Sequence, residues 1–195
     1  MRTCFTLPDG YAESDYVSRY VDVRLRSRLN IASFLIGAAV LAVGFLWRGF
    51  DALLALIRRG MHVYLLWVLL LAAGLLAFYT LHELTHGLAM RVFSGIRPHY
   101  GKKGLKLFAG SEAYFSRRDY IVAALAPAAV FTALFAVLTF LLRDEWFWLA
   151  IGLQSANLGS IVDDVYLALH ALRQPKSALF RTSGAGVTIY TEKTE

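Results

Sequence analysis

The chain has few charged residues and a single cysteine, and these two shortages exclude several kinds of protein and site. Asp, Glu, Lys and Arg make up 17% of its 195 residues, whereas hydrophobic residues make up 57%. A soluble domain covers its surface with roughly 25% charged residues, so we expect something other than water around much of this chain. Cys4 is the single cysteine, which excludes an intrachain disulfide and a zinc site built from cysteines.

Long apolar runs account for the excess of hydrophobic residues. They cover residues 31–47, 62–81 and 120–142, and a fourth run begins at Trp146-Phe147-Trp148 and turns polar after Gly152. A helix crosses a bilayer with about 17–25 apolar residues, and an aromatic start is typical of a membrane interface. The pattern predicts a mainly α-helical, polytopic membrane protein with about four transmembrane helices.

The basic residues are unevenly distributed. Sixteen of the twenty Lys and Arg residues lie in the N-terminal segment, between the second and third runs, or after the fourth. Because such loops usually face the cytoplasm, we expect a multi-pass protein of the cell membrane with both termini cytoplasmic. The net charge of +6 fits these loops, and no nucleic-acid-binding motif accompanies it. The expected partner is the lipid bilayer and not nucleic acid.

Three regions follow from this distribution. Residues 1–30 are expected to be a cytoplasmic N-terminal segment, residues 31–175 a membrane-embedded domain, and residues 176–195 a cytoplasmic tail. Within the domain, glycine and proline interrupt residues 95–118, and this stretch is too polar to span. We interpret it as a small cytoplasmic β-hairpin element, with one more short strand at residues 187–191.

The segment His82-Glu83-Leu84-Thr85-His86 ends the second apolar run. Histidines at i and i+4 project from one face of a helix, which suits two nitrogen ligands of one zinc ion. Glu83 lies beside the first ligand, and its carboxylate can take a proton from the zinc-bound water. Ionisable groups at the end of a membrane span are costly and tend to be functional. The pattern predicts Zn²⁺ held by His82 and His86, with Glu83 as general base.

A catalytic zinc needs a third protein ligand. Asp164 lies about as far into the fourth run as His82 lies into the second, so we expect the two at the same depth. Asn157, Ser160 and Asp164 form a polar stripe at helical spacing, which favours Asp164. Its neighbour Asp163 is the alternative ligand, or a partner that orients a histidine. His62 is expected to be a membrane-interface residue at the outer end of the second run. Structural roles are expected for His99 and His170, and a position in a strand for Glu112.

Several motifs carry a resemblance to a known family. They are HELTHGLAMRVFSG, a basic glycine-rich hairpin, Arg118-Asp119-Tyr120 leading into Leu125-Ala126-Pro127, and residues 157–164 followed by residues 172–176. From about Leu75 to Thr191 the chain resembles the zincin membrane peptidases catalogued as a domain of unknown function, which look like distant relatives of the site-2 proteases. The resemblance implies His82, His86 and Asp164 as ligands, Glu83 as the base, and Asn157 as a polar aid to substrate or oxyanion.

The sequence therefore predicts a zinc-dependent membrane metalloprotease. Its substrate would be a membrane or membrane-proximal protein, cut in or near the membrane. The alternative is a non-catalytic zinc-binding membrane protein that acts as a scaffold or regulatory partner. A transporter or channel would need ionisable residues spread along a pathway, whereas here they cluster at one depth.

Overall fold

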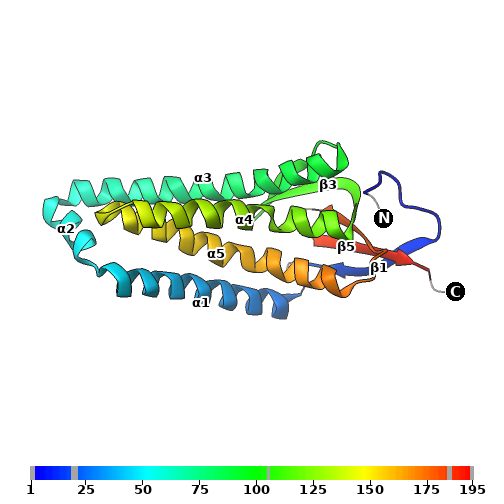
Figure 1. The fold of residues 1–195 in the computed structure, drawn as a ribbon, viewed down its shortest axis with the longest axis horizontal. Coiled ribbons are helices and arrows are strands. Elements are labelled where there is room, and N and C mark those ends of the chain that lie inside the picture. Colours follow the sequence, from blue (N-terminus) through cyan, green and yellow to red (C-terminus); the bar gives the residue numbers. More distant parts are fainter. Residues whose placement is uncertain (1–2, 19–21, 105, 184–185, 194–195) are drawn as a thin grey trace. The chain divides into compact units, whose positions relative to one another are not determined.

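The structure, a computed structural model, describes residues 3–18, 22–104, 106–183 and 186–193. Helices predominate over these residues, as the sequence predicts (Figure 1). They are α1 (Val23–Arg48), α2 (Asp51–Arg59), α3 (Met61–Ser94), α4 (Arg117–Leu141) and α5 (Asp144–Arg173). The strands are β1 (Tyr11–Val17), β2 (His99–Lys103), β3 (Lys106–Ser116), β4 (Leu179–Ser183) and β5 (Gly186–Glu192). Leu105 of the predicted hairpin element and the ends of both terminal segments lie outside the described residues.

Among the described residues, three helices are long and apolar enough to cross a membrane: α1, α3 and α4. Large apolar side chains cover them, and Phe34, Leu69 and Phe140 are 73%, 66% and 71% exposed. Apolar surface on this scale is typical of a face that a membrane or a protein partner covers. The fourth predicted span falls in α5, which is helical over 30 residues but is not one of these three helices. A fourth crossing therefore remains a prediction.

The strands form one antiparallel sheet in the order β1-β5-β4-β3-β2. The hairpin predicted within residues 95–118 is β2 and β3, with Tyr100 opposite Ala109. The short strand expected at residues 187–191 is β5. The sequence reading missed β1 and β4. Strand β1 comes from the N-terminal segment and pairs with β5 from the C-terminal tail, blue and red in Figure 1.

The chain divides into two compact units. The first contains Met1–Leu29, Leu81–Pro127 and Asp163–Glu195, and therefore the whole sheet. Its core joins sheet residues such as Phe180 and Ile189 to helix residues such as Tyr120. The rings of Tyr120 and Phe180 stack with centroids 4.7 Å apart, which fixes the start of α4 on the sheet.

The second unit contains Asn30–Thr80 and Ala128–Val162. It is helical, with one core cluster around Phe78, Phe131 and Phe135 and another around Phe147 and Trp148. Helix α2, which the sequence reading treated as part of a connection, buries Leu56 to 2% exposure in this unit.

Candidate metal centre

Helix α3 presents the two histidines of the HELTH segment from one face. The residues from Leu81 to Met90 include Leu, Glu, Ala and Met, which favour helix. The helix continues to Ser94, and Gly95 then takes a φ of 72° and donates its N–H to the carbonyl of Arg91 at 2.7 Å. This is a common helix ending. The i, i+4 spacing is therefore realised in a continuous helix.

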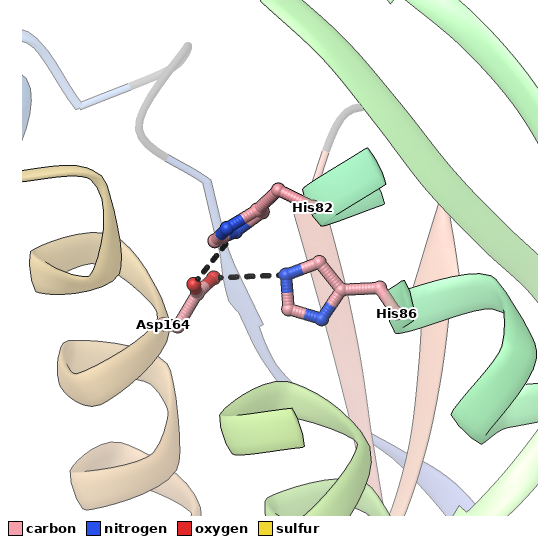
Figure 2. A group of neighbouring side chains, drawn as sticks. All are labelled: His82, His86 and Asp164. Carbon is pink, nitrogen blue, oxygen red and sulfur yellow. Dashed lines mark hydrogen bonds and ion pairs between the residues drawn. The ribbon is translucent and has the colours of Figure 1, made fainter. Parts of the chain in front are cut away.

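His82, His86 and Asp164 converge in the first unit (Figure 2). Nε2 of His82 lies 3.2 Å from Oδ2 of Asp164, and Nε2 of His86 lies 3.4 Å from Oδ1 of the same carboxylate. One ligand atom from each residue lies within 4.8 Å of the others. The histidines are only 5% and 8% exposed. Helices α3 and α5 therefore supply the three side chains of this group.

The three side chains fit a zinc ion in chemistry and spacing. Zinc takes imidazole nitrogen at about 2.0–2.1 Å and carboxylate oxygen at about 2.0–2.2 Å, so neighbouring tetrahedral ligands lie about 3.4 Å apart. The contacts of 3.2 Å and 3.4 Å, each to a different oxygen of Asp164, are close to this spacing, and the three ligand atoms lie within 4.8 Å of one another. Two imidazoles and one carboxylate would supply three ligands, which is the number that a catalytic zinc site takes from the protein.

Helix α4 provides a hydrogen-bond acceptor for the ring of His86. Nδ1 of His86 donates to the carbonyl oxygen of Ala123 at 3.0 Å, which directs the other ring nitrogen, Nε2, to Asp164. The start of α4 is fixed by Ser116, whose hydroxyl accepts the N–H of Asp119 at 3.2 Å as an N-cap. The cap and the Tyr120 ring stack thus place Ala123 where His86 can reach it.

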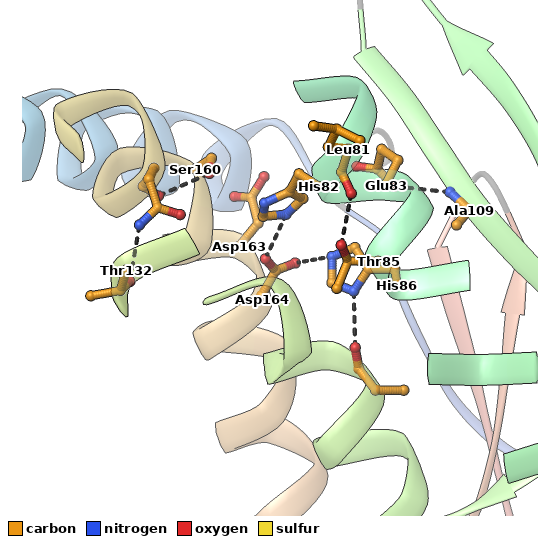
Figure 3. A network of polar contacts seen from close by, with 12 residues as sticks. Leu81, His82, Glu83, Thr85, His86, Ala109, Thr132, Ser160, Asp163 and Asp164 are labelled. Atoms are coloured by element: carbon orange, nitrogen blue, oxygen red, sulfur yellow. Dashed lines mark hydrogen bonds and ion pairs between the residues drawn. The ribbon is translucent and has the colours of Figure 1, made fainter. Parts of the chain in front are cut away.

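Glu83 lies on a neighbouring face of α3, and its carboxylate reaches the hairpin. Oε2 accepts the N–H of Ala109 on β3 at 2.9 Å, as Figure 3 shows. One oxygen of the carboxylate is thus engaged by the backbone. Glu83 therefore lies one residue from His82 in α3 and is held by the backbone of β3.

Asp163 and Asp164 have different surroundings, although they are adjacent in the chain. Oδ2 of Asp163 pairs with Nζ of Lys106 at 3.1 Å, and Asp163 is not part of the group formed by His82, His86 and Asp164. Of the two aspartates that the sequence left open, Asp164 is the one that contacts both histidines.

Asn157, which the resemblance implied as a polar aid, lies in the second unit and is fully buried. Its Nδ2 donates to Oγ1 of Thr132 at 2.9 Å and to Oε1 of Gln154 at 3.4 Å. Both amide protons are therefore used within that unit. Stabilising an oxyanion would require one of these hydrogen bonds to break. The proposed role of Asn157 in catalysis is not tested by these contacts and stays a prediction.

The other ionisable candidates have contacts away from this group. Nε2 of His170 lies 2.9 Å from Oδ2 of Asp15, and the His99 ring lies edge-on to Phe108. Glu112 forms an ion pair with Arg181. Burial raises the pKa of the Cys4 thiol, which keeps the thiol protonated at neutral pH. Among the described residues, none of these joins the histidine–aspartate group; His62, at the start of α3, also lies outside it.

Sequence reasoning missed the residues that support the site. Ala109 contributes its backbone N–H, which has no signature in the sequence. Tyr100 on β2 packs against Gly87, where an added Cβ would lie 2.8 Å from Cε1 of the Tyr100 ring. Gly87 directly follows the HELTH segment, and a glycine inside a helix is a signal of such a close approach. That signal could have predicted that another element packs on this turn.

The helices and the site define a class: a chain with membrane-length helices and a buried His-His-Asp group built on an HExxH helix. The chain belongs to the family described as "putative zincin peptidase", whose model matches residues 75–179, over half of the chain. This match covers the HELTH segment, the hairpin and both aspartates. No curated protein and no solved structure matches the chain.

Proposed function

We propose that the protein is a zinc-dependent membrane metallopeptidase that hydrolyses peptide bonds in or near the membrane. The observation that carries the proposal is the convergence of His82, His86 and Asp164 beside Glu83. Membership of a zincin peptidase family supports the zinc and the reaction class. The three membrane-length helices support the location. The distant similarity to site-2 proteases remains part of the proposal.

Each residue has a defined task in the proposed reaction. His82, His86 and Asp164 hold the zinc, which when bound supplies Lewis-acid activation of water and of the amide carbonyl. Glu83 accepts a proton from the attacking water as the new carbon–oxygen bond forms. When the carbon–nitrogen bond breaks, Glu83 returns that proton to the leaving amine. The N–H of Ala109 keeps the carboxylate oriented during both transfers.

The sheet supports an even number of membrane crossings. Strand β1 precedes α1, the β2–β3 hairpin lies between α3 and α4, and β4 and β5 follow α5. All five strands belong to one hydrogen-bonded sheet, so these segments have to be on the same side of a membrane. If α1, α3 and α4 cross, α5 has to cross as well to return β4 and β5 to the side of β1. We therefore propose four spans, with the sheet and both termini cytoplasmic as the basic residues predict.

The proposal is tested by incubating the zinc-loaded protein, reconstituted in lipid, with a panel of membrane proteins. New termini are then identified by mass spectrometry. Cleavage that disappears on chelation and returns with added zinc supports the proposal. Stoichiometric zinc without cleavage of any offered protein contradicts it and favours the non-catalytic alternative.

A further inference from the structure

Pro127 lies inside α4, four residues after Ala123. In an α-helix the carbonyl of residue i accepts the N–H of residue i+4, and proline has no N–H to donate. The proline ring also clashes with the carbonyl of residue i−4, which favours tilting that carbonyl away from the helix. The carbonyl of Ala123 therefore lacks its usual helical donor and is free to accept a hydrogen bond from outside the helix.

His86 provides that hydrogen bond. Its Nδ1 lies 3.0 Å from the oxygen of Ala123, and both residues are buried, at 8% and 2% exposure. With a proton on Nδ1 the ring keeps the lone pair of Nε2 for a metal. Nε2 lies 3.4 Å from Oδ1 of Asp164, so this tautomer presents its lone pair to the metal group.

We infer that Pro127 is a positioning residue of the metal centre: it releases the Ala123 carbonyl, which then holds His86 in its metal-binding tautomer and orientation. The inference rests on the proposed zinc site. Proline in a helix interior is the least favourable residue for helix stability. Pro127 is also fully buried, so its ring packs in the core in addition to releasing the Ala123 carbonyl.

The test is the zinc affinity of Pro127→Ala, measured by competition with a chelating dye on the full-length protein in detergent. Alanine restores the N–H at position 127, which competes with His86 for the Ala123 carbonyl. Loss of a carbonyl or carboxylate partner of a zinc-bound histidine typically weakens metal binding by about 10- to 100-fold. We expect a loss in that range, together with an apo-protein melting temperature equal to or above that of the wild type. Pro175→Ala is the matched control, because Pro175 is exposed and follows the end of α5.

The result that would overturn the inference is a Pro127→Ala dissociation constant within about twofold of the wild type. If the variant melts lower and binds poorly because its fold is damaged, imidazole ¹H–¹⁵N spectra of the wild-type protein decide. In the zinc-loaded protein the inference requires a slowly exchanging proton on Nδ1 of His86, hydrogen-bonded to the Ala123 carbonyl, and a proton on Nε2 in that state contradicts it. Failure of the wild-type protein to bind zinc would instead refute the proposed function itself.

Discussion

The hydroxyl group of Tyr100 occupies the space in which a side chain at Gly87 would begin. A Cβ added to Gly87 would also lie 2.8 Å from Cε1 of the Tyr100 ring, closer than side chains normally approach. Gly87 is one helical turn after Glu83, and Tyr100 is opposite Ala109, the residue that donates its N–H to Glu83. The missing side chain at position 87 therefore lets the β2–β3 hairpin lie on the turn of α3 that carries the proposed base.

Replacing Gly87 by alanine should loosen the hairpin. Alanine favours an isolated helix by about 1 kcal/mol over glycine, yet here the methyl group displaces Tyr100. We expect faster amide exchange over residues 106–110 and a turnover lower by about 10- to 100-fold, as small displacements of catalytic groups produce. Hydrogen exchange read by mass spectrometry measures the first effect.

The matched control is Gly74→Ala on the same helix. There the added Cβ meets Cδ2 of Leu153 at 3.4 Å, an ordinary van der Waals contact, so exchange over residues 106–110 should stay unchanged. Equal exchange in Gly87→Ala and the wild type would contradict the proposed hairpin contact.

Replacing Glu83 by glutamine should abolish most activity without removing zinc. A general base contributes about 10²- to 10⁴-fold to a rate, and glutamine cannot accept the proton. We expect turnover to fall in that range with an unchanged zinc content, because Glu83 is not one of the three clustered ligands. Glu112→Gln, which alters an ion pair with Arg181, serves as the control and should remain active. Peptidase activity that survives Glu83→Gln would refute the mechanism.

The number of membrane crossings can be read from reporter fusions. Four spans place a reporter at the N-terminus and one at the C-terminus on the same side, whereas three spans place them on opposite sides. Because β1 pairs with β5, we expect both reporters to be cytoplasmic and a reporter inserted at Arg143 to be on the other side. A C-terminal reporter outside the cytoplasm would contradict both the four-span topology and the β1–β5 pairing.

The parts of the molecule with strong local periodicity could be predicted from the sequence. The helical spacing of His82 and His86, and the similar depth of Asp164 in its own apolar run, predicted that the two histidines meet an aspartate of the fourth run. The choice between Asp164 and Asp163 stayed open. The hairpin was predictable because glycines interrupt residues 95–118 in an otherwise polar stretch. For the histidine pair and the hairpin the signal lies within a few residues, where backbone geometry decides the structure. For the aspartate it comes from the length of two apolar runs and the thickness of a bilayer.

The missed elements depend on distant partners. Strand β1 contains the acidic sequence Glu13-Ser14-Asp15, which has low strand propensity, and it is stabilised by pairing with β5 at the other end of the chain. Helix α2 has only nine residues, and its buried Leu56 depends on packing within the second unit. Such contacts between segments far apart in the sequence leave no local pattern to detect.

The most direct test of the account is the zinc content of the purified protein, measured by elemental mass spectrometry. The Asp164→Asn and Asp163→Asn variants are compared with the wild type. Asp164 contacts both histidines, whereas Asp163 pairs with Lys106. The account predicts close to one zinc per chain in the wild type and in Asp163→Asn, and a strongly reduced zinc content in Asp164→Asn. Full zinc occupancy in Asp164→Asn, or its loss only in Asp163→Asn, would contradict the proposed ligand set.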